Sequence, residues 1–143
     1  MSQIEGYDAV LLGQPLGPLG SPEEIRAKEQ QMLLKIVGDR RVLVLPHPVE
    51  LANGELDKYC VLPNAKLFST GVPSELLMLR LKPATTFTYA SNAAINYAMM
   101  NPRSKNYFYP VYRSRLSMLR TLQKSLPNVI VSDEYAEHDY PGD

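Results

Sequence analysis

His47 is the residue of this sequence best suited to chemistry on a phosphate. It lies between two prolines at the end of a run of valine and leucine, and the prolines restrict the backbone on both sides of the ring. An imidazole held in this way can donate a hydrogen bond to a phosphate oxygen, or protonate a leaving phosphate. A loop histidine without a role is the alternative that the sequence alone leaves open.

Two further polar positions extend this candidate site along the chain. Glu75 follows His47 by 28 positions, in the first turn of an expected helix. Its carboxylate can accept hydrogen bonds from a ribose diol, or simply interact with the helix dipole. Ser91 follows Glu75 by 16 positions and, with Asn92, begins another expected helix. The Ser91 hydroxyl and the free amides of that helix start can bind a phosphate, although a helix cap needs no further role.

The elements that must position these residues alternate between strands and helices. Apolar and β-branched runs predict buried strands at 8–14, 41–45, 65–69, 85–90, 106–112 and 128–132. Helical spacing and capping residues predict helices at 22–37, 73–81, 91–100 and 114–126, with a short helix near residue 56. This pattern is typical of an α/β fold. We expect a single Rossmann-like domain, with a mostly parallel sheet of about six strands and helices on both faces.

The predicted sheet indicates where a ligand would bind. In an open parallel sheet, ligands lie outside the carboxyl ends of the strands. The loops that follow the first four strands are therefore the candidate site, at 13–15, 46–48, 69–71 and 90–92. Three of these four loops lead toward a helix start, where free N–H groups attract phosphate. The sequence therefore predicts an anion site that needs few charged side chains.

Composition and missing motifs argue against several classes of function. Fifteen Lys and Arg balance fifteen Asp and Glu, which gives no general attraction to nucleic acid. The single cysteine, Cys60, cannot form an internal disulfide, and no apolar run approaches the ~18 residues of a membrane helix. With no signal-peptide pattern either, we expect a cytoplasmic protein. The sequence lacks a P-loop, a G-x-G-x-x-G after the first strand, metal-ligand spacings and a G-x-S-x-G motif, so no metal site is expected.

Four segments occur in an order that is similar to the carboxyl-terminal half of bacterial sialyltransferases: LLGQP, LPHPVE, VPSELLMLRLKP and YASNAAIN. The chain most resembles glycosyltransferase family 52, with kinship to the polysialyltransferase and marine-type sialyltransferase families. The resemblance extends from about residue 8 to residue 135 and includes the His-Pro pair and a later serine-containing motif. It implies that residues 1–143 form the nucleotide-sugar donor-binding domain of a GT-B enzyme, without the amino-terminal acceptor domain.

The resemblance also implies roles for individual residues. His47 would contact the phosphate of CMP-sialic acid and assist the departure of CMP. The other implied binding roles are Pro48 against the cytosine, Glu75 on the ribose hydroxyls, Ser91 with Asn92 on the phosphate, and Gly13 with Gln14 along the cleft. No metal or other cofactor is implied, and no catalytic base can be assigned in this chain.

These expectations leave three hypotheses for the function. The first is a sialyltransferase donor domain that binds CMP-sialic acid or CMP, inactive alone because the glycan acceptor binds through the missing domain. The second is a related glycosyltransferase domain with another nucleotide-sugar donor. It is motivated by Val49 and Asn92, where the family often has a basic residue and a second hydroxyl residue. The third is a non-enzymatic binding or structural module. A lone half exposes the surface that normally meets its partner domain, which favours homo-oligomers, and the full enzyme could associate with a membrane surface.

Overall fold

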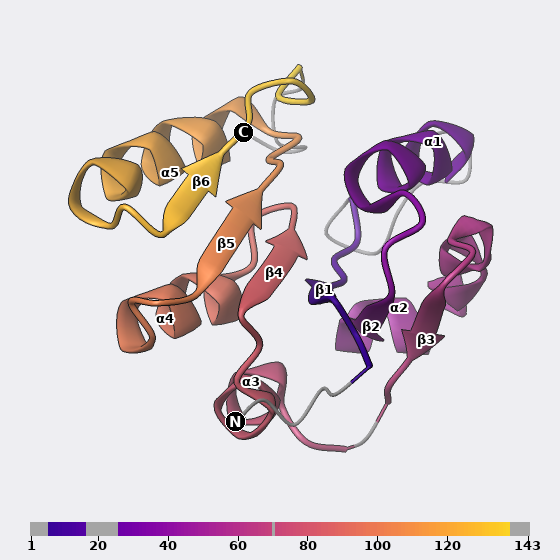
Figure 1. Cartoon of the computed structure of the whole chain (residues 1–143). Helices are drawn as coiled ribbons and strands as arrows, with labels where there is room; N and C mark the ends of the chain where they lie inside the picture. Colours follow the sequence, from indigo (N-terminus) through magenta and orange to yellow (C-terminus); the bar gives the residue numbers. More distant parts are fainter. Residues whose placement is uncertain (1–5, 17–25, 70, 138–143) are drawn as a thin grey trace.

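Six parallel strands form the centre of the molecule. The computed structural model describes residues 6–16, 26–69 and 71–137. In chain order the strands are β1 (Ala9–Leu12), β2 (Val42–Leu45), β3 (Ala65–Leu67), β4 (Thr85–Thr88), β5 (Lys105–Phe108) and β6 (Val129–Val131). They lie side by side in the order β3-β2-β1-β4-β5-β6, which Figure 1 shows from right to upper left. Every strand that the sequence predicted is present, each with fewer residues than expected.

Helices connect the strands, as the alternating pattern predicted. They are α1 (Arg26–Val37), α2 (Pro48–Ala52), the 3₁₀ helix η2 (Glu55–Val61), α3 (Ser74–Leu81), α4 (Asn92–Met100) and α5 (Arg113–Ser125). Helix α1 ends before Gly38, whose φ of 62° is the left-handed conformation common after a helix. The expected start of this first helix, at residues 22–25, lies outside the described residues. The expected short helix near residue 56 is η2.

Apolar side chains on the two faces of the sheet form two core layers. In β1, Val10 and Leu12 point into a layer with side chains of α3, α4 and α5. Ala9 and Leu11 point into the opposite layer, with side chains of α1 and η2. All four residues of β1 are buried, which explains why its sequence is continuously apolar. The structure therefore confirms the predicted α/β fold, with a parallel sheet covered by helices on both faces.

The order of the strands reverses its direction at β1, in the middle of the sheet. Strand β1 pairs with β2 on one side and with β4 on the other, and the chain crosses from β3 to β4 through α3. This order, 3-2-1-4-5-6, is that of a dinucleotide-binding Rossmann fold, in which ligands bind where the order reverses. In register, Leu12 lies beside Leu45 on β2 and beside Thr88 on β4. The residues that follow these three strands therefore meet at one edge.

The helices of the described ranges are all too short, or too polar, to cross a lipid bilayer.

Candidate functional site

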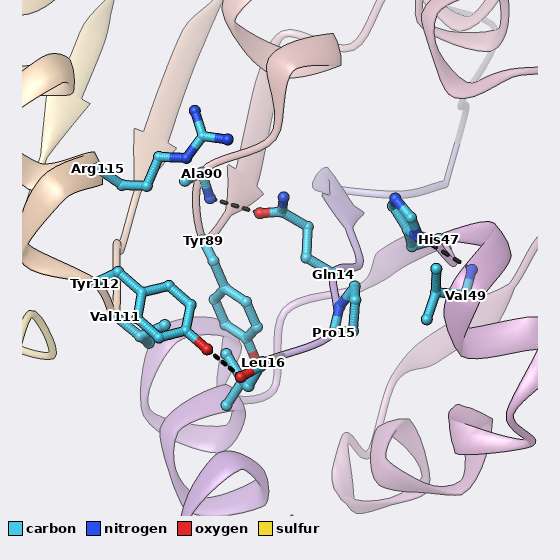
Figure 2. Close-up of a pocket in the computed structure, with 10 residues that line it drawn as sticks. All are labelled: Gln14, Pro15, Leu16, His47, Val49, Tyr89, Ala90, Val111, Tyr112 and Arg115. Atoms are coloured by element: carbon cyan, nitrogen blue, oxygen red, sulfur yellow. Dashed lines mark hydrogen bonds between the residues drawn. The ribbon is translucent and has the colours of Figure 1, made fainter. Parts of the chain in front are cut away.

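A pocket lies at the carboxyl edge of the sheet, next to the point where the strand order reverses. Its volume is about 230 Å³. Figure 2 shows the ten residues that line it: Gln14, Pro15, Leu16, His47, Val49, Tyr89, Ala90, Val111, Tyr112 and Arg115. They come from the segments after β1, β2, β4 and β5 and from the first turn of α5. The pocket thus includes residues of three of the four predicted loops, 13–15, 46–48 and 90–92. Ser69 and Gly71 of the fourth loop do not line it, and the segment after β5 was not predicted.

Gln14 connects the two sides of the pocket where β1 and β4 end. Its side-chain oxygen accepts a hydrogen bond from the backbone N–H of Ala90 at 2.6 Å, and one from the Thr88 hydroxyl at 3.3 Å. Figure 2 shows this amide reaching across to Ala90. Because the amide oxygen already has two donors, the N–H groups of the same amide are what Gln14 offers to a ligand.

The orientation of His47 is fixed by the start of α2. Its Nδ1 accepts a hydrogen bond from the backbone N–H of Val49 at 3.1 Å, so His47 is the N-cap of this short helix. An Nδ1 that accepts a hydrogen bond carries no proton, so the neutral ring has its proton on Nε2. His47 therefore presents an Nε2–H donor. The flanking Pro48, at the first helical position, is exposed and does not line the pocket.

Arg115 is a pocket residue that the sequence did not single out. It lies in the first turn of α5, and Figure 2 shows its guanidinium near Ala90, across the pocket from His47. A guanidinium only donates hydrogen bonds. Arg115 is exposed, like most charged residues in the first turn of an amphipathic helix, so the pattern of α5 did not distinguish it as a pocket residue.

Two tyrosines complete the wall of the pocket without offering their hydroxyl hydrogens. Tyr112 donates to the backbone oxygen of Leu16, and Tyr89 donates to Glu29 Oε2 at 2.7 Å. The described residues that line the pocket include no carboxylate. His47, Gln14 and Arg115 therefore present three hydrogen-bond donors, one of them positively charged, to the same space. Such a lining is complementary to an anion with several oxygen atoms.

A buried ion-paired cluster lies under the pocket. Lys58 Nζ contacts Glu50 Oε2 at 2.5 Å and Glu29 Oε2 at 2.9 Å, and all three side chains are at most 2% exposed. The hydroxyl of Tyr59 donates to Glu50 Oε2 at 2.7 Å. Burial and the nearby glutamates raise the pKa of both Tyr59 and Tyr89 well above the usual range of a phenol. These phenols therefore stay protonated and act as donors.

Glu50 joins this cluster to the pocket, and sequence reasoning did not select it. Its Oε1 accepts a hydrogen bond from the backbone N–H of His47 at 2.8 Å, which completes a capping box. The signal for this role was present in the sequence, because Glu50 is three residues after the N-cap and a proline stands between them. Gly13 packs against Glu50 and Tyr59. It is buried, and a Cβ at this position would lie 2.5 Å from Glu50 Oε1 and overlap the Tyr59 hydroxyl.

The remaining predicted residues lie outside the pocket lining. Glu75 is exposed on α3, where its Oε1 accepts a 3.5 Å hydrogen bond from Asn96 of α4. Ser91 is the N-cap of α4 and accepts from the backbone N–H of Ala93 at 3.2 Å. Asn92 is exposed at the first position of that helix. His47, Gln14 and the residue before Ser91 thus line one pocket. The nucleotide roles of all the predicted residues stay predictions: His47, Gly13, Gln14, Pro48, Glu75, Ser91 and Asn92.

Comparison with family models and with curated proteins identified no relative of this chain. No family model matches the chain, and no curated protein shows a significant match. In the ranges that the structure describes, no three His, Cys, Asp or Glu residues are grouped so that they could hold a metal ion. The pocket and the sequence motifs given above are therefore the features of this chain that indicate a function.

Proposed function

We propose that this chain is the donor-binding domain of a sialyltransferase-like glycosyltransferase, which binds CMP-sialic acid through its phosphate. One observation carries the proposal: the pocket at the strand-order reversal presents the donors of His47, Gln14 and Arg115 and is lined by no described carboxylate. The motifs that resemble sialyltransferases contribute His47 and Gln14 to this same pocket. The fold supports a nucleotide, and the motif resemblance supports the choice of CMP-sialic acid.

The donors suit the charge that such a transfer creates. When the bond between the sugar and the phosphate breaks, negative charge increases on the oxygen that leaves with CMP. The Nε2–H of His47 and the guanidinium of Arg115 can stabilise that charge by hydrogen bonds, without a proton transfer. Because Nδ1 of His47 is held by Val49, the donor is already oriented before the ligand arrives. Glu75 would contact the ribose only if the nucleotide extends from the pocket toward α3.

The small volume of the pocket is consistent with a domain that encloses only part of its ligand. A volume of about 230 Å³ is below the ~300–1,000 Å³ of sites that enclose a whole ligand. We infer that the phosphate and its neighbouring groups occupy the pocket, and that the rest of the donor is covered by a second domain. A GT-B enzyme has this division, with the donor in a cleft between two domains. The isolated chain is expected to bind CMP and to transfer no sugar.

Titration calorimetry with CMP tests the proposal, using His47→Asn as the informative variant. Asparagine is a good N-cap, so this variant keeps the hydrogen bond to Val49 N–H but lacks the Nε2–H donor. We expect an unchanged melting temperature and about tenfold weaker CMP binding, the effect of one hydrogen bond to a charged group. No heat of binding at millimolar CMP would remove the proposal. A larger thermal shift with UDP or GDP than with CMP would favour another nucleotide-sugar donor.

A further inference from the structure

Two of the residues that supply donors to the pocket, His47 and Gln14, are connected through one buried ion pair. Glu50, fully buried, accepts from the backbone N–H of His47 through Oε1 and contacts Lys58 Nζ through Oε2. Lys58, also buried, donates from the same Nζ to the backbone oxygen of Gln14 at 3.1 Å. His47 follows β2 and Gln14 follows β1. The ion pair therefore joins the ends of two strands at the positions where each supplies a pocket donor.

We propose that Glu50 and Lys58 are positioning residues for the pocket, and that they fix His47 and Gln14 as donors before a ligand binds. This inference rests on the proposed function for its ligand. The inference also predicts a single orientation of His47, which can be measured without any ligand.

The two oxygens of Glu50 have different partners, and a neutral amide cannot accept from both sets of them. A carboxylate accepts hydrogen bonds at both oxygens, and here Oε1 faces the His47 N–H while Oε2 faces Tyr59 and Lys58. An amide accepts at only one end. A glutamine at position 50 must therefore turn its NH₂ group either toward the His47 N–H or toward the Lys58 ammonium, and either choice places two donors against each other. In the first orientation the capping box of α2 loses its hydrogen bond from the His47 N–H, and in the second Lys58, which holds Gln14, loses its contact with position 50.

The close approach of Gly13 shows that the arrangement is tight. A Cβ on this residue would lie 2.5 Å from Glu50 Oε1. The end of β1 thus packs directly on the carboxylate that holds the end of β2, and Glu50 has little space in which to adopt another rotamer. This packing distinguishes a positioning contact from an ion pair that is merely buried.

Long-range ¹H–¹⁵N NMR of the imidazole tests the inference. The chain has two histidines, so a His138→Gln background leaves a single imidazole to observe. In ligand-free protein we expect one tautomer, with Nε2 protonated and Nδ1 accepting. In Glu50→Gln we expect a mixture of tautomers, shifted side-chain NH₂ signals of Gln14, and about tenfold weaker CMP binding. The control is Lys35→Met, which removes an exposed ion pair with Glu134 and should change none of these signals.

Two results would overturn the inference. One is a mixture of tautomers when position 50 is glutamate, a result that applies even if Glu50→Gln does not fold. The other is a Glu50→Gln spectrum with the same single tautomer and the same Gln14 signals as the parent. A parent protein with one tautomer and no affinity for CMP would instead remove the proposed function and leave the positioning role to be decided by the Glu50→Gln spectrum.

Discussion

The clearest consequence of the buried cluster is the expected effect of Gly13→Ala. The added methyl group would lie 2.5 Å from Glu50 Oε1 and 3.1 Å from Tyr59 Cζ, and would overlap the Tyr59 hydroxyl. Neither side chain can yield easily, since both are buried and hydrogen-bonded to each other. Overpacking a buried site costs about 1–3 kcal/mol. Separating the Tyr59–Glu50 hydrogen bond without replacing it costs about 1–3 kcal/mol more. The free energy of unfolding should therefore fall by about 2–6 kcal/mol.

Urea denaturation measures this loss. With a slope of about 2 kcal/mol per molar urea, the midpoint should fall by about 1–3 M. The matched control is Gly71→Ala, where a Cβ would meet nothing within 4 Å, and the midpoint should stay within about 0.5 M of the parent. Tyr59→Phe in the Gly13→Ala background removes the overlapping oxygen and should restore part of the loss. A Gly13→Ala midpoint equal to that of Gly71→Ala would refute the tight packing described for this site.

Three further outcomes are expected. Arg115→Gln should weaken CMP binding about tenfold, whereas Arg120→Gln, which removes an exposed arginine from the same helix, should leave the calorimetric affinity unchanged. The free energy of unfolding should fall as the pH rises above 10.0. Tyr59 and Tyr89 ionise there in the unfolded chain, whereas their raised pKa keeps them protonated in the folded protein. Urea midpoints that stay level from pH 9 to 11 would contradict this prediction. Ser91→Ala should cost about 1 kcal/mol by removing the cap of α4, whereas Ser91→Gly should cost only a few tenths, and equal urea midpoints for the two variants would count against the cap.

Much of the fold could be predicted because local signals agree with the tertiary structure. Runs such as residues 42–45 are continuously apolar, as a strand covered on both faces must be. Gly38 and Ser91 mark a helix end and a helix start by their own backbone and side-chain preferences. The place of the site followed from the fold, since ligands of open parallel sheets bind at the carboxyl edge.

The composition of the site was less accessible to sequence reasoning. Glu29, Glu50 and Lys58 are charged residues, which are ordinarily exposed, so nothing local indicates that they are buried together. Lys58 and Glu29 are 29 positions apart and meet only because η2 packs on α1. Arg115 reaches the pocket only because β5 lies beside β4, which places α5 at that edge. These contacts depend on tertiary packing rather than on spacing along the chain.

Amide mapping of CMP against cytidine tests the central claim most directly. The two ligands share the base and the ribose, and only CMP carries a phosphate. If the donors of His47, Gln14 and Arg115 bind an anion, CMP should shift the backbone amide of Ala90, the side-chain NH₂ of Gln14 and the imidazole of His47, and cytidine at the same concentration should not. Equal shifts with both ligands, or CMP shifts confined to residues away from this pocket, would contradict the account.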